Sequence, residues 1–276
     1  MVTRCRPLLG TFVEITVPDG TETEFVDRAF ATIAHIHEHM SFHSENSDIA
    51  KLRNAPPGRL VKVHADTVAV LRRAAGLHRE TGGLFDETIG AELVHSGFLP
   101  APSGFARGQI DGTADDIELV DDCHIRCHRR VLIDLGGIAK GYAVDRAIAI
   151  LVAGGVPEGL VNAGGDMRMF GERFWDVALR DADNSVRSAI QLGNCAVASS
   201  ANLRHRRRRL MRRVTPHIGR GRRSVLAAGR VSVIADDCTT ADAMTKVALV
   251  DRTLAECLLR DKGGRLLSQA DFKKAA

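Results

Sequence analysis

The segment from Leu132 to Asp145 constrains this chain most strongly, because it combines an apolar run, a glycine pair and a helical pattern. Val131–Leu135 is apolar except for one carboxylate and predicts a buried strand. After Gly136 and Gly137, apolar residues recur with the spacing of a helix face. They include Ile138, Ala143, Ala147 and Ile150. The sequence therefore predicts a strand that turns through two glycines directly into a helix.

Two charged residues flank this glycine turn and raise the question of an anion site. Asp134 lies near the end of the predicted strand, and Lys140 lies in the first predicted turn of the helix. Backbone N–H groups and the helix dipole favour an anion such as phosphate at a helix start. The segment has neither the P-loop pattern nor the G-x-G-x-x-G pattern of dinucleotide sites. These residues leave open either a phosphate-type site or an ordinary strand-to-helix connection.

Composition limits the class of protein. The chain has 276 residues, 45% of them hydrophobic, which allows a large core in one domain or two. Its net charge of +4 is too small to require a polyanionic partner. We expect no transmembrane helix, because a run of about 18 apolar residues is absent. The N-terminus shows no apolar signal-peptide region, so we expect a cytoplasmic protein unless a leader is missing from this sequence.

Six cysteines are scattered through the chain, which is large enough not to need disulfides, and we expect reduced thiols. The segment from Cys123 to His128 has the spacing C-x-x-x-C-H, whereas haem attachment requires C-x-x-C-H. In a strand, Cys123, Ile125 and Cys127 share one face, so a half-buried strand is favoured over a metal or haem site.

Hydrophobic periodicity and turn residues predict an α+β fold of mixed, mostly antiparallel sheets flanked by helices. We expect strands at residues 11–17, 60–63, 117–120, 124–135, 159–163, 166–170, 175–180, 188–192, 195–198 and 231–235. We expect helices at residues 21–40, 49–53, 67–80, 240–250 and 254–259, and one beginning near Ile138. No repeat or domain linker stands out, which predicts a single domain over residues 1–276.

Six segments, in their order along the chain, together resemble a known family. They are LGTFVEI from Leu9, MSFHSENSDI from Met40, TGGLFDETIG from Thr81, DLGGIAKGYAVD from Asp134, VNAGGD from Val161 and ADAM from Ala241. The chain resembles the ApbE-type FAD:protein FMN transferases, once labelled thiamine-biosynthesis lipoproteins, over roughly residues 7–260. The resemblance implies a T-fold unit that uses Mg²⁺ to cleave FAD and transfers FMN to a Ser or Thr of an acceptor protein. AMP would be released, and family members are often periplasmic.

The resemblance also implies site residues, by position. FAD contacts are expected from Leu9, His43, Leu84, Phe85, Asp86, Asp134 and Lys140. Metal ligands are expected from the carbonyls of Gly137 and Thr239 and the carboxylate of Asp242. His217 and Asp242 are the expected catalytic residues. A hard Mg²⁺ ion bound by oxygen ligands and a lysine near phosphate are chemically suited to breaking a pyrophosphate.

The sequence departs from the family pattern in two places. Lys246 stands four residues after Asp242, where the family has a threonine ligand, and Thr245 is one residue out of place. The segment Thr215–Gly221 replaces the family pattern Ile-Asp-Pro-x-Thr-Gly and lacks its Asp and Pro. These departures leave a second hypothesis open, which is an FAD-binding protein or FAD pyrophosphatase without protein flavinylation activity.

The arginine-rich run from Arg204 to Arg213 supports a third hypothesis, from another class of protein. Such a run is typical of a solvated loop, but it also fits a module that binds nucleic acid or an acidic partner. No aromatic residues interrupt the run, which disfavours single-strand stacking, and we regard a nucleic-acid partner as the weaker hypothesis. Gly164-Gly165-Asp166 is left open as either a functional turn or a β-bulge with a capping Asp.

Overall fold

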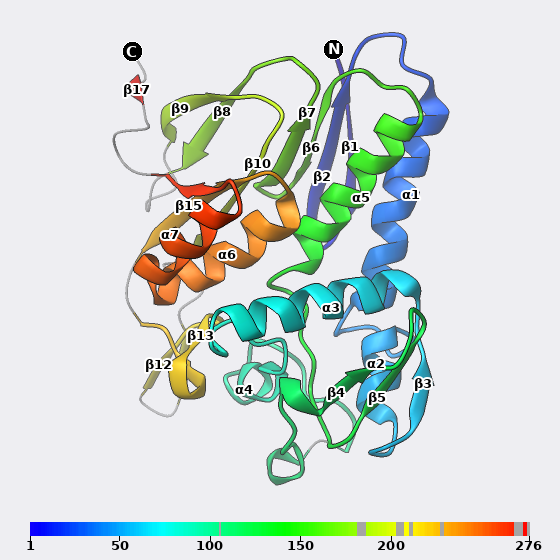
Figure 1. The fold of residues 1–276 in the computed structure, drawn as a ribbon, viewed down its shortest axis with the longest axis vertical. Helices are drawn as coiled ribbons and strands as arrows, with labels where there is room; N and C mark the ends of the chain where they lie inside the picture. Colours follow the sequence, from blue (N-terminus) through cyan, green and yellow to red (C-terminus); the bar gives the residue numbers. More distant parts are fainter. Residues whose placement is uncertain are drawn as a thin grey trace. The chain divides into compact units, whose positions relative to one another are not determined.

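The computed structural model describes residues 1–104, 106–180, 186–202, 207–209, 212–226, 229–267 and 273–274. The chain forms two compact units. Unit 1 comprises Met1–His35, Lys140–Leu203 and Ala228–Ala276, and unit 2 comprises Ile36–Ala139 and Arg204–Ala227. The chain passes between the units inside one long helix, α1, and again at the start of α5 (Figure 1).

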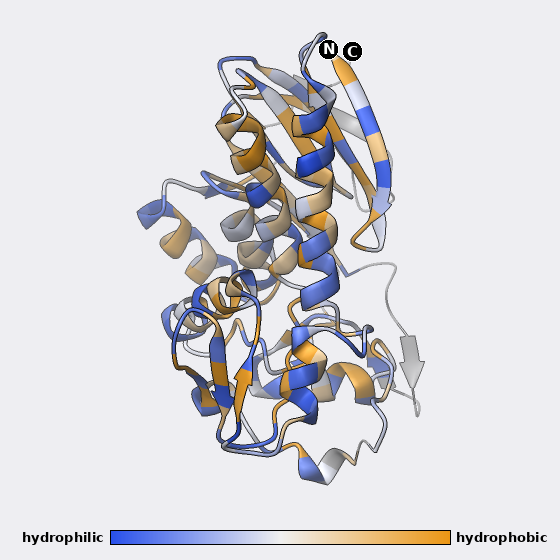
Figure 2. Cartoon of the chain, turned by 90° about the vertical axis from the view of Figure 1, so that its right-hand side faces the viewer, coloured by the Kyte–Doolittle hydropathy of each residue, from blue (hydrophilic) through white to orange (hydrophobic). Residues whose placement is uncertain are grey.

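Unit 1 is built on a seven-stranded antiparallel sheet. In spatial order its strands are β1 (Val2–Leu8), β2 (Thr11–Val17), β6 (Gly159–Ala163), β7 (Asp166–Phe170), β10 (Ala196–Ala201), β15 (Arg230–Ala235) and β16 (Arg265–Leu266). The alternating sequence of β2 buries Val13, Ile15 and Val17 on one face, as the period of two requires. Figure 2 shows the same alternation of hydrophobic and hydrophilic residues along the strands.

Helices and a second, smaller sheet complete unit 1. The helices are α1 (Thr23–Met40, as far as His35), α5 (Ala139–Ala153), α6 (Cys238–Val250) and α7 (Arg252–Asp261), and the smaller sheet joins β8 (Trp175–Arg180), β9 (Val186–Leu192) and β17 (Lys273–Lys274). Helix α6 packs against β10, β15 and α7. Glycines allow the close approach of α5 to its neighbours: a Cβ at Gly154 would lie 2.4 Å from the ring of Phe25 on α1. Helix α5 therefore packs against α1 at its C-terminal end.

Unit 2 combines helices with small sheets. The helices are α2 (Asp48–Asn54), α3 (Ala65–Glu80) and α4 (Gly90–His95), with single 3₁₀ turns at Arg107–Gln109, Ala114–Asp116 and Arg220–Arg222. A three-stranded antiparallel sheet has the order β3 (Leu60–Lys62), β5 (His124–Cys127), β4 (Ile117–Leu119), and two hairpins join β11 (Arg207–Arg209) to β12 (Arg212–Val214) and β13 (Ile218–Gly219) to β14 (Arg223–Ser224). Ser47 caps α2 by accepting from the N–H of Ala50 at 3.1 Å.

The predicted fold class is confirmed, and all six cysteines are free thiols as expected. The predicted strand at Val131–Leu135 is wrong, because β5 ends at Cys127 and the following residues join no ladder. Their backbone bonds instead to the start of α4 and the loop before it: Gly90 N–H donates to Leu132 O at 3.0 Å, and Asp134 N–H donates to Glu87 O at 2.8 Å.

Two further details of the fold differ from the sequence prediction. The N-terminal strand β1 was not predicted, although it pairs with β2 along its whole length. Gly164 and Gly165 form a two-residue hairpin turn between β6 and β7 and not a bulge, since Ala163 pairs directly with Asp166. Both glycines have positive φ, of 66° and 103°, which such tight hairpins require. That residues 1–276 form a single domain stays a prediction.

Candidate functional site

Four buried or half-buried charged residues of unit 1 form a cluster that we call the lysine–carboxylate cluster: Lys140, Asp166, Asp242 and Lys246. The Lys140 ammonium pairs with Asp166 and lies 3.7 Å from Asp242 Oδ2. The Lys246 ammonium pairs with Asp242 Oδ1. The backbone N–H of Gly141 donates to Asp242 Oδ2 at 3.2 Å. The cluster therefore alternates positive and negative charges from α5, β7 and α6.

The close approach of α5 and α6 creates this cluster. Gly141 lies in the first turns of α5, and a Cβ there would stand 2.2 Å from the carbonyl oxygen of Cys238. Asp145, one helical turn later, accepts from the N–H groups of Cys238 at 2.9 Å and Thr239 at 2.8 Å. Arg168 of β7 donates to the same carboxylate at 2.8 Å. Asp145 thus binds the N-terminus of α6 to α5, which satisfies two N–H groups that have no partner inside the helix.

The pKa values of the cluster follow from burial and the opposing charges. Burial raises the pKa of Asp242, but the ammonium groups of Lys140 and Lys246 outweigh it, so that this pKa lies below its ordinary value. Burial and then the charge of Asp242 raise the pKa of Asp166, although Lys140 opposes the shift. Burial lowers the pKa of Lys140, but Asp242 and Asp166 outweigh it, and this pKa lies above its ordinary value. Asp242 and Lys140 are therefore charged at neutral pH.

The side chains around Asp242 do not fit a divalent cation. One carboxylate oxygen already bonds to the Lys246 ammonium, and the other has Lys140 at 3.7 Å and the N–H of Gly141 at 3.2 Å. A metal ion bound to either oxygen would face at least one ammonium at close range, with no spare negative charge to offset it. The expected Mg²⁺ ligands Thr239 and Asp242 lie on the same helix, whereas Gly137 belongs to unit 2. The Mg²⁺ site stays a prediction.

The expected FAD segment of unit 2 is held by an arginine that sequence reasoning did not identify. Asp86 Oδ1 accepts from the N–H of Thr88 at 2.7 Å, and Asp86 Oδ2 accepts from Arg222 at 2.9 Å. Arg222 also donates to the hydroxyl of Thr88 at 2.6 Å and to the carboxylate of Glu92 at 3.2 Å. The side chain of Arg222 therefore connects three residues of the segment from Asp86 to Glu92. We call these four residues the Arg222 cluster.

Next to this cluster lies a buried carboxyl group with one oxygen that has no hydrogen-bond partner. Glu87 is 2% exposed, and neither its Oε2 atom nor the Nδ1 atom of His78 has a hydrogen-bond partner. Burial raises the pKa of Glu87 to about 7, and the neighbouring charge of Asp86 adds to the effect. The side chain of Glu87 therefore titrates near neutral pH.

The remaining expected residues occupy varied positions. Leu84 and Phe85 are buried, while His43 is exposed and lies edge-on to Phe42, with ring centroids 6.4 Å apart. Leu9 lies in the β1–β2 turn with a positive φ of 55°. His217 is half-buried, and its carbonyl accepts from the N–H of Val225 at 2.8 Å.

The structure brings together only some of the expected site residues within each unit. Lys140 and Asp242 meet in the lysine–carboxylate cluster, and Asp86 joins the Arg222 cluster. Asp166 and Arg222 are additional polar members that the family positions did not supply. The position of Asp166 directly after a glycine pair was a usable signal, whereas Arg222 had none.

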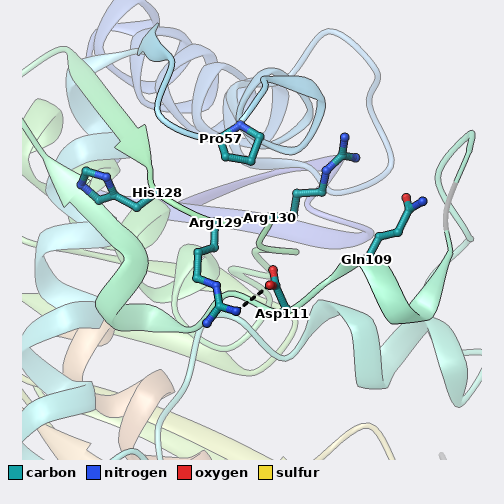
Figure 3. A pocket seen from close by; sticks show the side chains of 6 residues that line it. All are labelled: Pro57, Gln109, Asp111, His128, Arg129 and Arg130. Atoms are coloured by element: carbon teal, nitrogen blue, oxygen red, sulfur yellow. Dashed lines mark hydrogen bonds and ion pairs between the residues drawn. The ribbon is translucent and has the colours of Figure 1, made fainter.

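A separate pocket of about 490 Å³ opens on unit 2. Figure 3 shows the residues that line it, which are Pro57, Gln109, Asp111, His128, Arg129 and Arg130. Arg129 and Asp111 form an ion pair across it at 2.6 Å, which neutralises part of its basic lining (Figure 3). None of the expected site residues lines this pocket, and we assign it no ligand.

Comparison with known proteins places the chain. The model of the ApbE family matches residues 9–262. The chain belongs to the ApbE family. The predicted membership is thus confirmed, and the matched region includes the lysine–carboxylate cluster and the Arg222 cluster.

Curated relatives and a solved structure agree with this membership. The FAD:protein FMN transferase of Haemophilus influenzae is 25% identical over 240 residues, or 78% of this chain and 69% of the relative. That of Rhodobacter capsulatus is 27% identical over 189 residues, or 63% of this chain and 36% of the relative. The crystal structure of the ApbE protein of Thermotoga maritima is 26% identical, with a TM-score of 0.83, covering 96% of this chain and 93% of that one. Among the described residues, no helix is long and apolar enough to cross a membrane.

Proposed function

We propose that this protein transfers the FMN part of FAD to a Ser or Thr hydroxyl of an acceptor protein and releases AMP. The observation that carries the proposal is the match of the ApbE family over residues 9–262, which includes both charged clusters. The relatives of Haemophilus influenzae and Rhodobacter capsulatus bear the name FAD:protein FMN transferase. The alternating charges of the lysine–carboxylate cluster are consistent with a site for a phosphate-bearing substrate.

The reaction exchanges one phosphorus–oxygen bond for another. The acceptor hydroxyl oxygen attacks the phosphorus on the FMN side of the pyrophosphate, the bond to AMP breaks, and AMP leaves with the bonding electrons. The proton of the hydroxyl passes to a base, and we assign this role to His217. Lys140, as a compact positive charge, stabilises the phosphate oxygens as charge develops on them.

The other assignments divide between binding and positioning. We assign Leu9, His43, Leu84, Phe85, Asp86 and Asp134 to the binding of FAD. Asp242 orients the two ammonium groups of the lysine–carboxylate cluster. The family resemblance also implies Mg²⁺, but the charges around Asp242 do not fit it, and the proposal assigns no step to a metal ion.

The test uses purified protein, FAD and a peptide that carries a flavinylation-type Ser or Thr acceptor. We expect AMP release and a gain of one FMN mass on the peptide. Release of AMP and free FMN without peptide modification would favour the pyrophosphatase alternative, which Lys246 at a family ligand position supports. If FAD neither binds nor turns over, both functions are excluded.

Two further expectations concern a charged partner and the location of the protein. Half of the run from Arg204 to Arg213 lies outside the described residues, and its described part belongs to β11 and β12. A salt titration of binding to duplex DNA tests whether the run binds nucleic acid. We propose a cytoplasmic location, which fractionation of cells that produce the full-length protein would test.

A further inference from the structure

The lysine–carboxylate cluster balances its charges without a metal ion. Asp166 and Asp242 carry two negative charges when ionised, and Lys140 and Lys246 carry two positive charges. Asp242 is fully buried, and Asp166 is 3% exposed. A buried charge is tolerated only when it is paired, and here each carboxylate has at least one ammonium partner. A divalent cation added to this balanced set would leave an excess of positive charge.

The geometry of helix α6 brings the ammonium of Lys246 to the carboxylate of Asp242. The two residues are four apart on α6, with the carboxylate on the N-terminal side, which is the favourable order for an ion pair on a helix. The ammonium also donates to the hydroxyl of Thr245 at 3.1 Å. Lys246 is 24% exposed as a side chain, so its stem is packed while its ammonium meets two acceptors.

The neighbouring hydroxyl is not available to a metal ion. Thr245 is fully buried and donates to the carbonyl of Asp242 at 2.7 Å. It also pairs with the hydroxyl of Ser200 on β10 at 2.7 Å. The hydroxyl of Thr245 is thus already bonded to Asp242 O, Ser200 and the Lys246 ammonium, and it does not replace the oxygen ligand that a lysine at position 246 removes.

We propose that the ammonium of Lys246 is the resident cation of the Asp242 carboxylate, and that this protein binds no divalent cation there at millimolar concentrations. The positive charge beside Asp242 then belongs to a side chain of the protein and does not depend on the supply of metal ions. The inference rests on the proposed function only in one respect, which is that the positive charge of Lys246 would face a phosphate of the substrate. Ion binding itself is measured without flavin, so the two proposals fail separately.

The experiment titrates Mn²⁺ into the purified protein without flavin and follows free Mn²⁺ by electron paramagnetic resonance. The measured quantity is the binding that Asp242→Asn removes. We expect none in the parent protein, and a melting temperature that neither Mg²⁺ nor EDTA changes. In Lys246→Thr, which removes the ammonium paired with Asp242 Oδ1, we expect Asp242-dependent Mn²⁺ binding at concentrations at least about tenfold below those at which the parent shows none.

Two control variants separate charge from general effects. Lys246→Arg keeps a cation and should exclude Mn²⁺ as the parent does. Lys62→Thr removes an exposed lysine of β3 and should also behave like the parent. Mn²⁺ binding by the parent at or below millimolar concentrations that is lost in Asp242→Asn would overturn the inference, as would a folded Lys246→Thr with no gain. If Lys246→Thr does not fold, the parent and Lys246→Arg titrations decide alone.

Discussion

Arg222 donates to the carboxylate of Asp86 at 2.9 Å, although 136 residues separate them in sequence. The backbone of Arg222 has a φ of 56°, in the left-handed region that costs a non-glycine residue of order 1 kcal/mol. The hydrogen bonds to Asp86, Thr88 and Glu92 offset this strain. Because Asp86 lies in the expected FAD segment, Arg222 is a positioning residue for that segment.

Replacing Arg222 by alanine should therefore weaken FAD binding. We expect the dissociation constant for FAD to rise by roughly tenfold, since Asp86 and Glu92 lose a shared charged donor worth about 1.5 kcal/mol. Fluorescence titration of FAD measures the change. Arg223→Ala, next in sequence and exposed, is the matched control and should leave FAD affinity unchanged. Equal losses in both variants would refute the positioning role.

Glu87 makes stability depend on pH near neutrality. Its pKa rises from 4.5 to about 7 on folding, so the folded protein holds a proton that the unfolded chain releases. The contribution of Glu87 to stability is therefore fully present below about pH 4.5 and is lost as pH rises through 7, by up to roughly 3 kcal/mol. Urea denaturation from pH 5 to 8 measures this loss. Glu87→Gln should remove the slope, and a variant with the parent's slope would contradict the assignment.

Gly141 sets the distance between α5 and α6. A Cβ at this position would lie 2.2 Å from the Cys238 carbonyl oxygen and 2.9 Å from the Cα of Thr239, and neither backbone atom yields easily. We expect Gly141→Ala to destabilise the protein by about 3 kcal/mol, at the upper end of overpacking effects. Gly76→Ala is the control, because nothing lies within 4 Å of its Cβ on α3. That variant should gain about 0.5–1 kcal/mol, and calorimetry distinguishes the two.

Asp242→Asn keeps the size of the side chain but removes the charge shared by Lys140 and Lys246. Breaking a buried ion pair costs about 3–5 kcal/mol, so we expect a folded but less stable protein. AMP release should fall by roughly two to three orders of magnitude, because the ammonium group of Lys140, the proposed electrostatic stabiliser, is no longer held in place by Asp242. Asp237→Asn is the control, because Asp237 caps α6 and is not a member of the lysine–carboxylate cluster, and asparagine caps a helix equally well. If both variants lose AMP release alike, Asp242 has no special role.

The sequence predicted the fold class well, because most strands and helices carry their own periodic patterns. β2 alternates along Thr11–Val17, and its buried residues are those that the alternation selects. The prediction of a strand at Val131–Leu135 was wrong, because an apolar run indicates that a segment is buried but does not indicate which groups its backbone bonds to. Here the N–H of Gly90, at the start of α4, and the carbonyl of Glu87, in the loop before it, bond to this segment in place of a strand.

The candidate site was only partly accessible from sequence. Lys140 and Asp242 were predicted because each lies in a recognisable segment. The relation of Arg222 to Asp86 was not, since it depends on a long-range approach that no local pattern encodes. The pairing of Lys246 with Asp242 follows from helical spacing. The balance of charges in the whole cluster, which includes Asp166, could not be predicted, because it depends on how α5 packs against α6.

The central claim is that this protein moves FMN from FAD to a protein hydroxyl. The most direct measurement is the intact mass of an acceptor peptide after incubation with the protein and FAD, alongside quantified AMP. The account predicts one FMN unit per modified peptide, an equal amount of AMP, and no modification when the acceptor Ser or Thr is replaced by alanine. An unmodified peptide in the presence of bound FAD would contradict it.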